Sequence, residues 1–139
     1  MPTFYNLLNE LAELAPDFCS RTHQIDKEGH PYNVWRCQSS QPGSSPEHIL
    51  QYDSENSRAS LSEPDLKNLA YAIKTQLLHE GWSFACWYRA RPIHGNRCWE
   101  IELSPYGKPG TKANFHEATG DSEAECFLKA YASQLRDPG

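Results

Sequence analysis

Three arginines and two tryptophans lie close together in the second half of the chain, and their residue types are suited to binding chemistry. They are Trp87, Arg89, Arg91, Arg97 and Trp99, on two strand-like segments and the turn between them. Arginine beside tryptophan can stack on bases and hold phosphates, or it can anchor a protein interface. An arginine laid over a core tryptophan is also a common packing arrangement. The pattern indicates a binding surface for a protein or, alternatively, for nucleic acid or a nucleotide, and packing alone would also produce it.

Two cysteines and two histidines have a spacing that could suit a metal. They are Cys19, His23, His30 and Cys37, within a turn-rich segment. Structural zinc sites use four such ligands, usually in close pairs such as C-x2-C. Cys19 and His23 are near each other in sequence, but His30 and Cys37 do not form a recognisable pair. The sequence favours a partly buried thiol and surface histidines over a metal site, and it predicts no cofactor.

Residues that could perform catalysis show no local signature. Cys86 and Cys98 lie on neighbouring predicted strands with His94 in the turn between them, but nothing marks a nucleophile beside a histidine held by a carboxylate. Glu100 and Glu102 alternate onto one strand face, where they could form an acid–base pair or bind a metal. Core thiols and solvent-facing carboxylates explain both patterns. We therefore expect no catalytic residues and no enzymatic activity.

The arginines and tryptophans belong to a predicted helix, three strands and a second helix in residues 62–139. Ser62 and Asp65 form a capping-box variant before a helix that has one apolar face and closes at Gly81. The strands FACWYRAR and RCWEIEL alternate in polarity around the turn PIHGN, and ANFHEA adds a third. These segments predict a three-stranded antiparallel meander between two helices.

The last helix begins at Asp121 or Ser122, and Ser122 with Glu125 makes a capping box. Its apolar stripe should lie across one face of the meander while its other residues face water. The stripe contains Ala124, Phe127, Leu128, Tyr131 and Leu135, and the expected water-facing residues are Glu123, Glu125, Lys129 and Gln134. Because the meander carries aromatic residues on both faces, we expect the N-terminal helix and the strands VWRCQ and HILQYD to cover its second face.

The N-terminal half adds a helix, loops and two short strands. TFYNLLNELAELAP has apolar residues at helical spacing, and DFCSRTHQIDKEGHPYN reads as turn-rich. VWRCQ and HILQYD are the short strands, separated by polar loops. The sequence thus predicts one α+β domain over residues 1–139, with an antiparallel sheet packed against helices. Residues 1–61 form its N-terminal part and residues 62–139 the helix–meander–helix unit.

Composition limits the classes of function. The net charge is -5, with 13 basic and 18 acidic residues, which argues against a surface that attracts nucleic acid as a whole. No apolar stretch approaches the ~18 residues of a membrane span. The first fifteen residues lack the basic start and apolar run of a signal peptide. Five cysteines, an odd number placed mostly inside predicted elements, suit reduced thiols. We expect a cytoplasmic protein without membrane contact.

The helix–meander–helix order, ending in ATGDSEAECFLKAYASQL, resembles the double-stranded-RNA-binding domain from Asp65 to Leu135. In that family the last strand also leads through a glycine-containing turn into an alanine-rich helix. The resemblance implies a lysine cluster at the start of this helix to hold phosphates. The matching positions here are Asp121, Ser122, Glu123, Ala124 and Glu125. Their carboxylates would repel phosphate, so this mode of RNA binding is not expected.

Residues 118–130, ATGDSEAECFLKA, also resemble the end of small phage-encoded proteins with an α/β sandwich domain. Those proteins often end in a strand, a run close to ATGD and a helix carrying Ala-x-Cys-x-Ala. The resemblance implies a phage or prophage accessory protein and carries over no catalytic residue. Together with the acidic charge and the aromatic-rich hairpin, it predicts a non-catalytic interaction module whose partner is a host or phage protein, such as a phage accessory protein or an anti-defence inhibitor that binds a host protein. The alternative is a nucleic-acid or nucleotide binder that uses the Arg/Trp hairpin.

Overall fold

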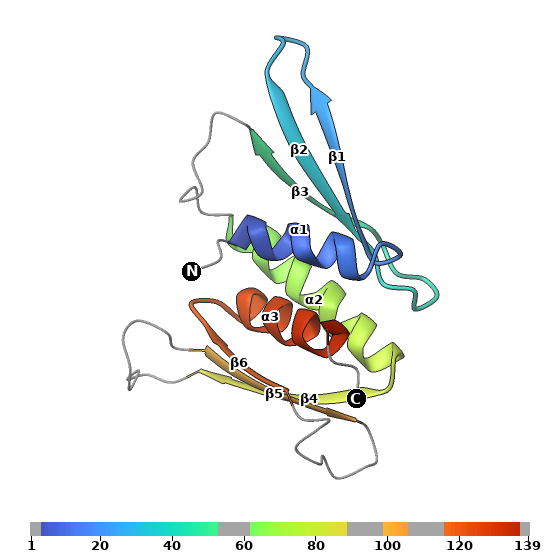
Figure 1. Cartoon of the computed structure of the whole chain (residues 1–139), viewed down its shortest axis with the longest axis vertical. Coiled ribbons are helices and arrows are strands. Elements are labelled where there is room, and N and C mark those ends of the chain that lie inside the picture. Colours follow the sequence, from blue (N-terminus) through green and yellow to red (C-terminus); the bar gives the residue numbers. More distant parts are fainter. Residues whose placement is uncertain (1–3, 53–61, 89–98, 106–115, 137–139) are drawn as a thin grey trace.

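The computed structural model describes residues 4–52, 62–88, 99–105 and 116–136, which form three layers (Figure 1). A layer of helices lies between two three-stranded antiparallel sheets. The helices are α1 (Phe4–Leu14), α2 (Glu63–His79) and α3 (Glu123–Arg136). Sheet A contains β1 (Cys19–Ile25), β2 (Pro31–Cys37) and β3 (Glu47–Tyr52), and sheet B contains β4 (Trp82–Tyr88), β5 (Trp99–Pro105) and β6 (His116–Gly120). The expected α+β class is confirmed.

The two predicted helix caps are present. Ser62 Oγ accepts a hydrogen bond from the Asp65 backbone N–H at 3.3 Å. Ser122 Oγ accepts one from the Glu125 N–H at 3.1 Å. The Glu125 carboxylate in turn accepts from the Asp121 N–H at 3.0 Å, one residue before the position of a standard capping box. Both helices therefore start where local hydrogen-bond chemistry predicts.

Sheet B is the predicted antiparallel meander, in the order β4-β5-β6. Phe84 pairs with Leu103 and Cys86 with Ile101, so the apolar residues of neighbouring strands share one face. α3 packs on this face through β5 and β6. Residues 113–115 of the predicted third strand lie outside the described residues.

The second face of sheet B is not covered as expected. α1 packs against α3 and β1, and sheet A lies on the far side of the helix layer (Figure 1). Among the described residues, no helix or strand covers the outer face of sheet B, which carries Trp87, Glu100 and Glu102. The expectation was wrong because the helices bury apolar side chains toward both sheets and so separate them.

α3 is the central helix of the molecule. Phe127 and Leu128 are fully buried, as predicted, and burial extends around most of the helix. The prediction that Gln134 faces water is wrong, because it is also buried. The reason is that α3 contacts sheet B on one side and both α1 and α2 on the other.

Sheet A contains a strand that the sequence did not predict. The segment read as turn-rich forms β1, which pairs along its whole length with β2. All of β1 after Cys19 is exposed, so it lacks the apolar alternation that marks a strand. The turn that follows is stabilised by the Asp26 carboxylate, which accepts from the Glu28 and His30 N–H groups at 2.9 Å each. Gly29 adopts φ of 85°, a left-handed conformation that suits glycine.

One cluster of buried side chains joins the three layers. It includes Trp35 and Ile49 from sheet A, Leu8 and Phe127 from the helices, and Ile101 from sheet B.

Within the part of the chain that the structure describes, no helix is both long and apolar enough to cross a lipid bilayer.

Two buried glutamines differ in hydrogen bonding, so their replacement by leucine should have different effects on the free energy of unfolding. Gln76 Oε1 accepts from the Ser40 N–H at 2.7 Å and from Ser39 Oγ at 3.1 Å, whereas Gln134 Oε1 has no partner among the described residues. Gln76→Leu should lower the free energy of unfolding by about 1–3 kcal/mol, because it leaves buried donors unpaired. Gln134→Leu should leave that energy unchanged or raise it, because it removes an unsatisfied carbonyl. Urea denaturation measures both, and equal losses would contradict the prediction.

Candidate functional site

The structure divides the predicted Arg/Trp surface. Trp87 pairs with Glu100 and Tyr88 pairs with Trp99 across β4 and β5. Successive residues of a strand point to opposite faces, so Trp87 lies on the outer face of sheet B and Trp99 on the face toward the helices. The two tryptophans therefore do not share a face of sheet B, and the binding role predicted for them stays a prediction. Arg89, Arg91 and Arg97 lie outside the described residues.

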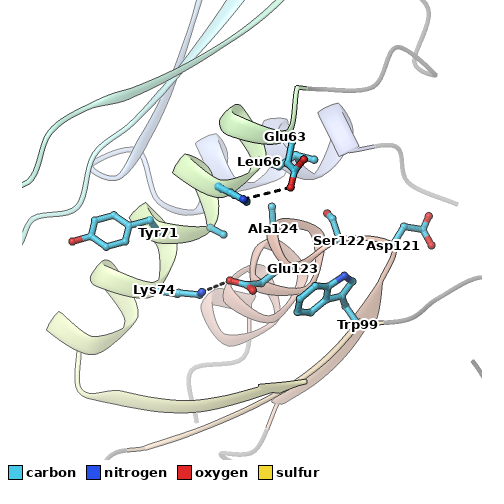
Figure 2. A pocket seen from close by; sticks show the side chains of 11 residues that line it. Glu63, Leu66, Tyr71, Lys74, Trp99, Asp121, Ser122, Glu123 and Ala124 are labelled. Atoms are coloured by element: carbon cyan, nitrogen blue, oxygen red, sulfur yellow. Dashed lines mark ion pairs between the residues drawn. The ribbon is translucent and has the colours of Figure 1, made fainter. Parts of the chain in front are cut away.

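Trp99 forms one wall of a cavity of about 470 Å³ between the first half of α2 and the start of α3 (Figure 2). Leu66 and Ala70 of α2 and Ala124 of α3 supply further apolar lining. Trp99 is held at its backbone, where its carbonyl accepts a hydrogen bond from Cys126 Sγ at 3.3 Å. Its ring meets Tyr88 edge-on, with centroids 5.2 Å apart. The cavity thus has an aromatic wall fixed by both β5 and α3.

Charged side chains form the rim of this cavity, and most of them are paired. Lys67 Nζ lies 3.4 Å from Glu63 Oε1, and Lys74 forms an ion pair with Glu123 that joins α2 to α3 (Figure 2). Asp121 completes the rim, and its carboxylate has no ion-pair partner among the described residues. Counting only the described lining residues, the rim charges balance apart from the carboxylate of Asp121 at the start of α3.

Tyr71 is the most exposed large hydrophobic side chain among the described residues at the cavity. It projects from α2 with 70% of its surface accessible, and it also lines two neighbouring hollows. Leu78, two turns further along α2, is exposed beside one of them. Exposed aromatic residues beside apolar hollows are typical of protein-binding surfaces. Sequence reasoning missed Tyr71, although an aromatic residue outside the apolar stripe of a predicted helix was the available signal.

The four residues with metal-like spacing do not gather into a site. Cys19 and Cys37 pair across β1 and β2, with their Sγ atoms 3.5 Å apart. His23 pairs with Asn33 further along the hairpin, and His30 lies in the turn, 3.6 Å from Asp26. In the described ranges, no cluster of three or more His, Cys, Asp or Glu residues is arranged to hold a metal.

The candidate nucleophile Cys86 is half-buried in β4, and Cys126 of α3 is a buried thiol that the sequence did not single out. Burial raises the pKa of Cys86 to about 11 and that of Cys126 to about 12, so both are protonated at neutral pH. Cys98 and His94 lie outside the described residues. Glu100 and Glu102 lie on the outer face of sheet B, away from the cavity lined by Trp99. Of the described residues, Cys86 lies on the inner face of sheet B and the two glutamates on the outer face, so these three do not form a catalytic arrangement with one another.

A serine–histidine contact that the sequence did not indicate joins α3 to β6. His116 Nδ1 lies 3.0 Å from Ser133 Oγ, and the buried imidazole packs edge-on against Trp82. Neither residue lines the cavity between α2 and α3. Since a nucleophile must reach its substrate, we interpret this contact as packing between helix and sheet.

The cavity between α2 and α3, with Tyr71 at its edge and Trp99 as its wall, is therefore the best candidate for a functional site. It has an apolar lining, and within the described parts of the chain Asp121 is the rim carboxylate without an ion-pair partner. Comparisons of the chain with models of protein families, with curated proteins and with solved structures find no significant match.

Proposed function

We propose that this chain is a small, non-catalytic interaction module of the cytoplasm that binds a partner protein at the cavity between α2 and α3. The observation that carries the proposal is Tyr71, an exposed aromatic residue where the apolar cavity meets two further hollows. Tyrosine and tryptophan dominate the binding energy of protein interfaces, especially beside pockets from which a partner excludes water. Tyr71 and Trp99 would supply such a pair of contacts.

The charges on the cavity rim indicate which side chains a partner would need. Lys67 and Lys74 are already paired within the chain, which leaves the carboxylate of Asp121 to meet the partner. A partner with an apolar side chain for the cavity and a basic residue beside it would complement this surface. Asp121→Asn should therefore slow association more than it speeds dissociation.

The resemblance of residues 118–130 to phage proteins makes bacterial host proteins the first partners to test. An accessory or anti-defence inhibitor of this kind would act by occupying a surface of its host target. Such an inhibitor would need no reaction and no cofactor.

Tyr71→Ala should weaken partner binding about fivefold or more, because truncating a central interface aromatic commonly costs more than about 1 kcal/mol. Its thermal stability should change little, because the side chain is mostly exposed. The matched control is Ile25→Ala, which truncates a side chain of similar exposure (66%) at the end of β1, far from the cavity (Figure 1). Quantitative pull-down from a bacterial lysate, followed by titration of the captured protein, measures both variants. Equal binding by the wild type and Tyr71→Ala would remove the cavity from the proposed function.

The nucleic-acid alternative has less support. On the outer face of sheet B, Trp87 is neighboured by Glu100 and Glu102 rather than by basic residues of the described strands. Carboxylates there disfavour phosphate. A gel-shift series at rising salt tests the alternative: nucleic-acid binding that falls steeply with salt and is lost in Arg89→Ala would replace the protein-partner proposal.

A further inference from the structure

Two buried thiols face each other where the β1–β2 hairpin joins α1. Cys19 and Cys37 are direct partners in the strand register, and their Sγ atoms lie 3.5 Å apart. Both residues are fully buried, and Cys19 Sγ also lies 4.0 Å from the carbonyl oxygen of Leu8 in α1. The pair takes no part in the cavity proposed to bind a partner.

The backbone places this pair at a spacing that a disulfide can bridge. The Gln38 N–H donates to the Phe18 carbonyl at 2.9 Å, immediately outside the pair. In an antiparallel ladder this bond identifies Cys19 and Cys37 as a non-hydrogen-bonded pair, whose Cα atoms are about 4.5 Å apart. Disulfides span Cα separations of about 4.4–6.8 Å. A bond between the two sulfurs therefore needs side-chain rotation without a change of register.

We propose that Cys19 and Cys37 are a redox-sensitive pair that forms a cross-strand disulfide when the chain meets a low-molecular-weight disulfide such as oxidised glutathione. One protein thiol, as its thiolate, attacks a glutathione sulfur and releases one glutathione thiolate. The second protein thiolate attacks the mixed disulfide and releases the other. The protein loses two electrons and two protons, and one oxidised glutathione becomes two reduced glutathiones.

The reduced pair is protected in the closed hairpin. A hydrogen bond to Cys19 and then burial raise the pKa of the Cys37 thiol, and the neighbouring Glu47 carboxylate acts in the same direction. Thiolate formation therefore requires the base of the hairpin to open. Once formed, the disulfide would close the loop of the whole hairpin and hold β1 to β2 beside α1.

The experiment treats the full chain with oxidised glutathione under native conditions and with a phosphine reductant in parallel. Intact mass should show the loss of two hydrogens, and a peptide map without reduction should join the Cys19 and Cys37 peptides. The oxidised protein should melt about 10 °C above the reduced protein, because the cross-link restricts the unfolded chain. Reduction should reverse both changes.

Two variants separate this pair from the other thiols. Cys37→Ala should abolish the mass loss and the melting shift, whereas Cys126→Ala, which removes another fully buried thiol, should retain both. The mass and the peptide map of the wild type do not depend on how well either variant folds. A glutathione adduct that never resolves, a map that links different cysteines, or unchanged mass after oxidation would each overturn the proposal.

Discussion

Phe127→Ala is expected to remove a large share of the free energy that keeps the protein folded. The Phe127 ring is fully buried in α3, meets Phe84 of sheet B edge-on at 4.9 Å, and has the Lys74 ammonium 5.1 Å from its centroid. Its removal leaves a cavity between α2, α3 and sheet B and should cost about 3–5 kcal/mol. That is a large share of the ~5–15 kcal/mol that holds a domain folded. Circular dichroism and urea denaturation measure the loss.

Leu78→Ala is the matched control, because it truncates an apolar side chain that is more than half exposed on α2. It should change the free energy of unfolding by no more than about 0.5 kcal/mol. If Phe127→Ala instead unfolds at the wild-type urea concentration, α3 does not seal sheet B and the described packing is wrong.

Trp35→Ala is expected to detach sheet A from the helix layer. Trp35 is almost completely buried, stacks on Tyr5 of α1 with centroids 5.4 Å apart, and donates from Nε1 to Asn9 Oδ1 at 3.1 Å. Arg21 Cζ lies over the indole of Trp35, 5.7 Å from the ring centroid. Loss of the indole should cost about 3–5 kcal/mol, because it removes packing and leaves the Asn9 acceptor unpaired. Hydrogen exchange should show early loss of protection in β1, β2 and β3.

The neighbouring exposed residue provides the control for this second change. Arg36→Ala alters the other face of the same strand and should retain wild-type exchange in sheet A. Trp35→Phe should retain part of the packing while losing the N–H donor. Its exchange protection in sheet A should therefore lie between that of Trp35→Ala and that of Arg36→Ala. Uniform loss of protection in both sheets after Trp35→Ala would show that sheet A cannot open independently of sheet B.

The helices and the meander could be predicted because their signals are local. Ser62 and Ser122 accept the N–H groups that the start of each helix leaves unpaired, and this requires only neighbouring residues. Alternating polarity in β4 and β5 around a short turn likewise predicts that these two strands pair in an antiparallel hairpin. Such signals need no knowledge of the rest of the chain.

The missed features depend on residues distant in sequence. β1 has almost no apolar face, and it is a strand because its backbone pairs with β2. Gln134 occupies a polar position of the α3 pattern, yet it is buried because α1 and α2 cover the side of α3 away from sheet B. Neither outcome follows from periodicity within the segment itself.

The candidate site shows the same division. The sequence by itself determined that α2 and α3 start with caps, that sheet B is an antiparallel meander, and that aromatic residues are concentrated near Trp99. Tertiary structure alone decided that Trp87 and Trp99 occupy opposite faces, and that Tyr71 stands beside a cavity walled by Trp99. The physical reason is that caps and alternation arise from neighbouring residues, whereas a cavity exists only where helices and strands distant in sequence pack together.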